Sequence, residues 1–274
     1  MTPQFCDTSA LAGRLANTGA LHLFLDYDGT LADFAPTPDD IFPDPAIAEL
    51  MSRLAQLPRT EVAIISGRRL SHIEALVPVS EILLAGTYGI ELRWPDGATT
   101  HRVDWSAIRP ALDSLKPRWA ALIEEHRGFY LEDKGWSLAL HARFADDGVA
   151  EDVLSNARHL ADKVIAQAQA GRFRILGGHK FLEIGPAQAN KGDTIRFLAQ
   201  HDPQTGALPV YIGDDDKDEE AFAVINELGG QAIVVAADDR PSRAGCRLLS
   251  PAATRQFLQI LANRRAAHEP PVSP

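Results

Sequence analysis

Two acidic residues, Asp26 and Asp28, stand one residue apart at the end of an apolar run in the stretch LHLFLDYDGTL, residues 21–31. Carboxylates this close repel each other, and burial at the end of a strand raises the free energy of their charged forms. A hard cation relieves that repulsion, and Mg²⁺ takes oxygen ligands while keeping substrate phosphate in its coordination shell. The pair therefore indicates metal-assisted chemistry on a phosphate group.

The chemistry that suits this pair is phosphoryl transfer through a covalent intermediate. Asp26 can attack phosphorus and form an aspartyl-phosphate. Asp28 lies on the flexible side of the turn, where it can protonate the leaving oxygen and then deprotonate the water that clears the intermediate. Gly29 permits a sharp turn, and Thr30 offers a hydroxyl and a backbone N–H to phosphate.

Two short motifs further along the chain can hold the phosphoryl group. In SGR, Ser66 offers a hydroxyl, Gly67 offers a backbone N–H, and Arg68 can reach substrate from the same loop. In KGD, Lys191 stands at the start of a predicted helix, where its charge balances that of the nucleophile and the phosphoryl group. We predict Ser66 and Lys191 as catalytic residues and Arg68 as a substrate-binding residue.

The acidic cluster GDDDKDEE, residues 213–220, completes the predicted metal site. Asp26 and an acid of this cluster could supply two carboxylates to Mg²⁺, and Asp214, Asp215 and Asp218 would hold the ion directly or through water.

Alternating strands and helices must bring these motifs together. We predict strands over 21–26, 61–67, 81–89, 209–215 and 231–236, and helices over 44–58, 68–77, 190–201, 217–228 and 251–266. This order is typical of a parallel sheet, whose ligands bind at the carboxyl ends of the strands. All the motifs above follow such strands or open a helix.

The middle of the chain has a different pattern. It predicts antiparallel strands over 98–105 and 136–144, helices over 107–127 and 147–170, and a hairpin over 172–186 that turns at Gly177-Gly178. The predicted fold class is therefore α/β. A Rossmann-like parallel-sheet core, residues 1–96 and 185–274, carries an inserted smaller α+β cap, residues 97–184.

The composition and net charge of the chain limit the kinds of partner that it can bind. The formal net charge of −10 disfavours nucleic acid and anionic membrane, and no apolar run is long enough to cross a bilayer. Two cysteines, Cys6 and Cys246, are too few for a metal-binding spacing or a disulfide framework. The first residues lack the pattern of a signal peptide. We therefore expect reduced thiols and a cytoplasmic protein.

The motifs DYDGT, SGR, KG and GDDxxDE, in this order, resemble those of haloacid dehalogenase superfamily phosphatases. Within that superfamily, residues 21–261 resemble the trehalose-6-phosphate phosphatases, through LFLDYDGTLADF, VAIISGRR, LEDKGWSLALHARF, KFLEIGPAQANKGDTI and PVYIGDDDKDEEAF. The resemblance implies trehalose 6-phosphate as substrate, functional pairing with a trehalose-phosphate synthase, and sugar-binding roles in the cap for Glu132, Lys134 and Glu183. With the resemblance in hand, we predict that Mg²⁺ is held by the carboxylates of Asp26 and Asp214 and by the backbone carbonyl of Asp28. Asp215 and Asp218 are then expected to support the metal from one layer further out.

Two positions depart from the family pattern. Tyr88, in GTYG, stands where the family often has histidine, and Lys217 stands where it usually has threonine. We interpret Lys217 as a solvated lysine on an outer helical turn. Tyr88 keeps open a phosphatase for another sugar phosphate, such as sucrose phosphate or a mannosyl phosphoglycerate. A third interpretation is a catalytically idle sugar-phosphate binding partner of a synthase.

Overall fold

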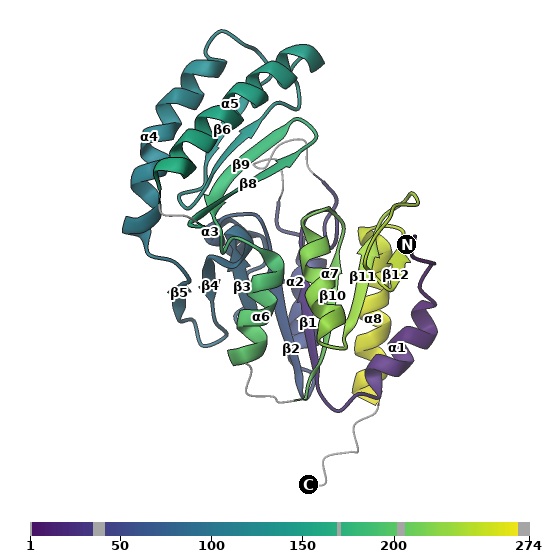
Figure 1. Ribbon diagram of the computed structural model, residues 1–274. Coiled ribbons are helices and arrows are strands. Elements are labelled where there is room, and N and C mark those ends of the chain that lie inside the picture. Colours follow the sequence, from purple (N-terminus) through teal and green to yellow (C-terminus); the bar gives the residue numbers. More distant parts are fainter. Residues whose placement is uncertain (1, 35–41, 169–170, 202–205, 268–274) are drawn as a thin grey trace. The chain divides into compact units, whose positions relative to one another are not determined.

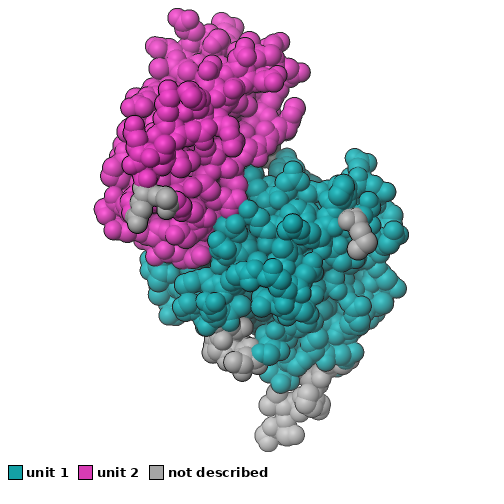
Figure 2. All heavy atoms as spheres, in the orientation of Figure 1, with its two compact units in different colours: residues 1–100, 190–274 teal, residues 101–189 magenta. Residues whose placement is uncertain are grey.

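The computed structural model describes residues 2–34, 42–168, 171–201 and 206–267 (Figure 1). The chain divides into two compact units, coloured separately in Figure 2. Unit 1 comprises residues 1–100 and 190–274, and unit 2 comprises residues 101–189. Both divisions fall a few residues later than the expected boundaries at 96 and 184. Unit 1 is therefore assembled from both ends of the chain.

Unit 1 is built on an eight-stranded sheet of order β12-β11-β10-β1-β2-β3-β4-β5. Its strands from β12 through β3 are parallel, and β4 runs antiparallel to β3. The strands are β1 (Leu21–Leu25), β2 (Thr60–Ile65), β3 (Leu83–Gly86), β4 (Glu91–Arg93), β5 (Thr99–His101), β10 (Leu208–Gly213), β11 (Gln231–Val235) and β12 (Cys246–Leu248).

Helices cover both faces of this sheet. One face packs against α1 (Thr8–Ala16), α2 (Pro45–Ala55), α3 (Leu70–Leu76) and α8 (Pro251–Ala267). The other face packs against α6 (Lys191–His201) and α7 (Asp218–Glu227), which lie side by side in Figure 1. Because both faces are covered, every residue of the central strand β1 is buried, which explains its nearly continuous apolar sequence.

Unit 2 is a four-stranded antiparallel sheet of order β6-β7-β9-β8 with two helices on one face. Its elements are α4 (Trp105–Ile123), β6 (Tyr130–Asp133), β7 (Leu138–His141), α5 (Asp147–Gln167), β8 (Phe173–Gly178) and β9 (Phe181–Pro186). Leu138, Leu140, Leu182 and Ile184 pack against the helices. Strand alternation turns the residues between them to the opposite face. The predicted fold class, a parallel-sheet core with a smaller α+β unit, is confirmed.

Two predictions about the middle of the chain are wrong. Thr99–His101, expected within the cap, belongs to the eight-stranded sheet and not to the four-stranded antiparallel sheet. The β8–β9 hairpin turns at His179 and Lys180, since Gly178 still pairs with Phe181. Lys180 has a φ of 54°, so a lysine takes the left-handed conformation in this turn.

The expectation of two unpaired cysteines is also wrong. Cys6 and Cys246 form a disulfide with their Cα atoms 5.0 Å apart. The N-terminal segment runs beside β12, where the backbone N–H of Cys6 donates to the carbonyl of Arg247 at 2.9 Å. The disulfide therefore attaches this segment to the edge of the sheet. Within the described residues, no helix is long and apolar enough to span a membrane.

Candidate active site

Three strand ends form the centre of the site. Asp26 follows β1, Ser66 follows β2 and Asp214 follows β10. These three strands are neighbours in the sheet and parallel, so their carboxyl ends meet at one edge. Asp26 and Ser66 are buried. The backbone N–H of Asp26 donates to the carbonyl of Ile212 at 2.9 Å, which fixes the first acid beside β10.

Lys191, the first residue of α6, forms ion pairs with two acids of the site. Its Nζ lies 3.0 Å from Oδ1 of Asp26 and 2.6 Å from Oδ1 of Asp218. Burial lowers the pKa of Lys191, but the two carboxylates outweigh that effect and hold the pKa well above its usual value. The ammonium group is therefore charged at neutral pH and supports one oxygen of Asp26.

Asp218 organises the loop after β10. Its Oδ1 accepts hydrogen bonds from Lys191 and from the hydroxyl of Tyr211, at 2.6 and 2.5 Å. Its Oδ2 accepts from the backbone N–H groups of Asp214 and Asp215, at 2.8 and 2.9 Å. The side chain is fully buried. With both oxygens engaged, Asp218 positions the loop, and the carboxylates of Asp26 and Asp214 are better suited to a metal.

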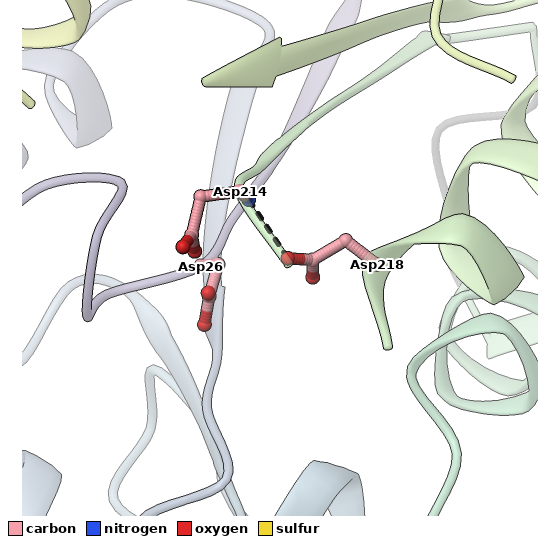
Figure 3. Close-up of side chains that lie close together, drawn as sticks. All are labelled: Asp26, Asp214 and Asp218. Atoms are coloured by element: carbon pink, nitrogen blue, oxygen red, sulfur yellow. Dashed lines mark hydrogen bonds between the residues drawn. The ribbon is translucent and has the colours of Figure 1, made fainter. Parts of the chain in front are cut away.

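The side chains of Asp26, Asp214 and Asp218 converge from three segments, as Figure 3 shows, with carboxylate oxygens within 4.8 Å of one another. Burial raises the pKa of Asp26 well above its usual value, and neighbouring acids raise it further, against the opposing charge of Lys191. Burial and the charges of Asp218 and Asp215 raise the pKa of Asp214 to about 7. Such a crowded set of oxygens suits a hard divalent cation.

Asp215 differs from its neighbour in its partners. Burial raises the pKa of Asp215, but Lys191 and Lys217 outweigh burial and leave that pKa below the usual range. The Oδ1 atom of Asp215 accepts from the backbone N–H of Lys217 at 2.8 Å. Consecutive acids thus have opposite pKa shifts, because a lysine pairs with Asp215 while Asp214 faces other carboxylates.

Gly29 lets the turn after β1 approach this cluster. Its φ is 72°, and a Cβ added there would lie 2.3 Å from Oδ2 of Asp214. Thr30, next in the turn, donates from its hydroxyl to Oδ1 of Asp214 at 3.3 Å. The glycine predicted for a sharp turn is therefore also required by close packing against the acid after β10.

Asp28 is oriented by Arg68. The guanidinium donates from Nε to Oδ2 at 2.7 Å and from Nη2 to Oδ1 at 2.8 Å, a two-point geometry that fixes the carboxylate plane. The loop itself is fixed by a hydrogen bond from the backbone N–H of Arg68 to Oγ of Ser66 at 3.1 Å. The structure thus places Arg68 on Asp28, and its contact with substrate stays a prediction.

Unit 2 brings its own predicted residues together. Glu132, Ala139 and Glu183 occupy one register row across β6, β7 and β9. Buried Lys134 donates to Oε2 of Glu183 at 3.0 Å. Glu132 lies 3.1 Å from Nε2 of His141. The three side chains predicted to bind sugar therefore form one polar cluster on the sheet face opposite the helices.

Comparison with known proteins identifies the family. The profile of the family described as trehalose-phosphatase matches residues 24–252. The chain belongs to the trehalose-phosphatase family.

A relative from Sinorhizobium fredii, named "Probable trehalose-phosphate phosphatase", is 33% identical over 254 residues, covering 93% of this chain and 91% of that protein. "Trehalose-phosphate phosphatase" of Mycobacterium tuberculosis is 34% identical over 252 residues, covering 88% of this chain and 61% of that longer protein. The C-terminal domain of Candida albicans trehalose-6-phosphate phosphatase shares the fold, with a TM-score of 0.80, 21% identity, and coverage of 95% and 98%.

The surroundings of one residue near the acidic cluster differ from our expectation. Lys217 is not a solvated lysine on an outer turn, because only 25% of its side chain is exposed and its Nζ lies 3.3 Å from Oδ2 of Asp215. We misjudged the exposure of Lys217 because the helical periodicity of the sequence does not show which other segments pack against the first turn of α7.

Two residues around the acidic loop were missed. Tyr211 lies inside β10, and its hydroxyl donates to Asp218. The sequence PVYIGDD contains this tyrosine shortly before the acids, and a polar group at that place in a buried strand could have indicated a role in the site. Arg240 donates to the carbonyl of Asp214 at 2.5 Å and to Oδ1 of Asp216 at 2.7 Å. It comes from the loop after β11, and no sequence pattern connects that loop with the acids.

Proposed function

We propose that this trehalose-phosphatase family member hydrolyses trehalose 6-phosphate to trehalose and phosphate through an aspartyl-phosphate on Asp26. The observation that carries the proposal is the buried Asp26 carboxylate, supported on one oxygen by Lys191 and close to the oxygens of Asp214. Membership of the family supports the substrate, a phosphorylated sugar.

The chemistry proceeds in two steps. In the first, an oxygen of Asp26 forms a bond to phosphorus while the bond from phosphorus to the sugar oxygen breaks, and protonated Asp28 gives its proton to the leaving oxygen. In the second, water attacks phosphorus, Asp28 takes the proton, and the aspartyl–phosphorus bond breaks. Ser66 and Lys191 hold the phosphoryl oxygens throughout.

The acidic cluster would hold Mg²⁺ through the carboxylates of Asp26 and Asp214 and the backbone carbonyl of Asp28. When bound, the ion would supply positive charge against the carboxylates and the phosphoryl group. Asp215 and Asp218 would support it from outside: Asp218 fixes the loop by accepting from two backbone N–H groups, and Asp215 accepts from Lys217. The crowding that raises the pKa values of Asp26 and Asp214 favours this assignment.

We assign catalysis to unit 1 and sugar selection to unit 2. Glu132, Lys134 and Glu183 would bind sugar hydroxyls, because a site that hydrogen-bonds a substrate hydroxyl strongly rejects a sugar that lacks it. Their grouping on one sheet face supports a shared role. Cytoplasmic localisation and pairing with a trehalose-phosphate synthase remain predictions, which fractionation and co-purification would test.

The deciding experiment measures phosphate release from trehalose 6-phosphate, sucrose phosphate, mannosyl phosphoglycerate and glucose 6-phosphate, with Mg²⁺ and with EDTA. We expect metal-dependent release that strongly favours trehalose 6-phosphate and is lost in Asp26→Asn. Preference for another ester would overturn the substrate while keeping the mechanism. Release that survives Asp26→Asn would overturn the mechanism, and no release from any ester would favour the idle binding protein.

A further inference from the structure

The two positions that depart from the family pattern contact each other. Nζ of Lys217 lies 6.0 Å from the centroid of the Tyr88 ring. A cation within about 6 Å of an aromatic face is attracted by the ring, so this distance is at the outer limit of a favourable interaction. Two side chains that are far apart in the sequence therefore form one cation–aromatic pair in unit 1.

The ring of Tyr88 is fixed beside the phosphate-binding loop. The backbone N–H of Tyr88 donates to the carbonyl of Ser66 at 2.8 Å, and its carbonyl accepts from Oγ1 of Thr194 at 2.8 Å. A Cβ added to Gly67 would lie 2.7 Å from Cζ of the ring, so the phenol packs directly on that glycine. Tyr88 has a φ of 56°, which lies in the left-handed region that is strained for a residue with a side chain.

The sheet order places Lys217 over the catalytic edge. Lys217 follows β10 and Tyr88 follows β3, and the order β10-β1-β2-β3 puts two strands between them. Neighbouring strands lie about 4.8 Å apart, so a contact between these residues extends across the ends of β1 and β2. Those ends carry Asp26 and Ser66. The ammonium of Lys217 is thus held between Asp215 and the tyrosine ring, on the edge of the sheet to which Asp26 also belongs.

The charges at this edge leave a role for a further cation. Its acids are Asp26, Asp28, Asp214, Asp215 and Asp218. The guanidinium of Arg68 binds Asp28, Lys191 lies between two of the other acids, and the Mg²⁺ proposed above would add two positive charges. A phosphate monoester adds about −1.5 to −2 charges at neutral pH. Positive charge fixed in advance stabilises such a group most, since no reorganisation is needed.

We propose that Lys217 is a substrate-binding residue that contacts a phosphate oxygen, and that Tyr88 is the positioning residue that holds it there. The assignment rests on the phosphatase function proposed above and adds a cation to its phosphate site. It replaces our interpretation of Lys217 as a solvated lysine.

The test is a double-mutant cycle on the intact protein with Mg²⁺ present. Its variants are Lys217→Met, Tyr88→Asn and their combination, with Lys217→Arg, Tyr88→Phe and the exposed Lys163→Met as controls. Asparagine tolerates a positive φ, so Tyr88→Asn removes the ring with little added backbone strain. The readouts are KM and kcat for trehalose 6-phosphate, and the Kd for inorganic phosphate measured by calorimetry.

Loss of a charged hydrogen bond should raise KM and the phosphate Kd about tenfold in Lys217→Met, with kcat within about twofold. Tyr88→Asn should weaken binding alone but add almost nothing in the combined variant. Lys217→Arg and Tyr88→Phe should stay near wild type. A Lys217→Met variant that behaves like Lys163→Met overturns the proposal, as do effects that multiply in the combination. If trehalose 6-phosphate is not hydrolysed, only the proposed function is overturned. The Kd for inorganic phosphate would still show whether Lys217 binds phosphate.

Discussion

At the residue scale, the acids Asp214 and Asp215 show how local charge sets what a carboxylate can do. The pKa of Asp214 is raised to about 7 by burial and by neighbouring acids, whereas the pKa of Asp215 is lowered by two lysines. Near neutral pH, Asp214 without metal exchanges a proton, while Asp215 stays charged. Asp214, like Asp26, is therefore a group whose charge a metal can change.

The first prediction concerns pH and Mg²⁺. Binding must displace the proton from Asp214, and from Asp26 where that group is protonated, so affinity should rise at least about tenfold per pH unit from pH 5 to 7. In EDTA, the native state binds this proton when the unfolded state, with a pKa near 3.8, has lost it. The contribution of Asp214 to the free energy of unfolding should therefore fall as pH rises from about 4 to 7.

Calorimetric Mg²⁺ titrations and urea unfolding in EDTA, at several pH values, would measure both effects. Asp214→Asn is the control, because it cannot take up the proton. Its stability relative to wild type should improve as pH rises. Equal pH profiles for the two proteins would contradict the raised pKa.

The second prediction concerns the orientation of Asp28. Removing the two-point contact in Arg68→Met should let the carboxylate rotate, and misplacing a catalytic group can reduce kcat about 100-fold. The matched control is Arg69→Met, because Arg69 is adjacent and exposed. Steady-state phosphate release measures the effect. An Arg68→Met variant with normal kcat and a raised KM would instead assign Arg68 to substrate binding.

At the element scale, the turn after β1 must fit against the loop after β10. Gly29 and Gly97 both have a positive φ, 72° and 84°, but only Gly29 has neighbours where a Cβ would stand. Gly29→Ala and Gly97→Ala should each lose about 1–2 kcal/mol of stability from backbone strain. Only Gly29→Ala should also displace Asp214 and weaken Mg²⁺ binding.

Thermal unfolding of the two glycine variants measures the effect of backbone strain, and Mg²⁺ titration measures the effect of the close approach to Asp214. We expect at least about tenfold weaker Mg²⁺ binding in Gly29→Ala and unchanged binding in Gly97→Ala. Equal metal affinity in both variants would show that the close approach is unimportant for the site.

The sheet of unit 2 carries the fourth prediction. Glu183→Gln keeps the shape of the side chain but removes the charge that pairs with Lys134. If the cluster binds sugar hydroxyls, KM for trehalose 6-phosphate should rise about tenfold or more with little change in kcat. Asp133→Asn is the control, since it weakens another ion pair of unit 2, with Arg109. Equal KM values in the two variants would indicate a structural role for Glu183.

Sequence patterns predicted the main elements and most of the residues that meet at the ends of the strands. The strands ending at Asp26, Ser66 and Asp214 carry long apolar runs, and each run is followed by a motif. The short elements α1, β4, β6 and β12 were not predicted, because three to nine residues give little periodicity. The contacts of Arg240 and Lys217 were also missed, since they depend on how loops pack and not on any local pattern.

At the scale of the whole molecule, the disulfide closes the chain over a separation of 240 residues. Cys6→Ser combined with Cys246→Ser should lower the free energy of unfolding by about 2–4 kcal/mol, because the unfolded chain gains freedom. Phosphate release should be unchanged, since β12 lies at the sheet edge, with β11 and β10 between it and β1.

Urea unfolding with and without dithiothreitol measures this contribution. Reductant should bring the wild type to the stability of the double variant and leave that variant unaffected. A wild type that is insensitive to reductant would show that the two thiols are not joined in solution.

The pairing of β1 with β10 also has a consequence for biosynthesis. Leu21 pairs with Leu208, so the ribosome must add nearly the whole intervening chain before β1 gains its second neighbour. At about 5–20 residues per second, this delay lasts roughly 10–40 s. Throughout that time the nascent chain has Asp26 but lacks Asp214, and for most of it the chain also lacks Lys191. A translation product that stops before residue 208 would therefore have an unpaired edge on β1 and would be inactive, even with unit 2 fully synthesised. Such a product would be a target for chaperones.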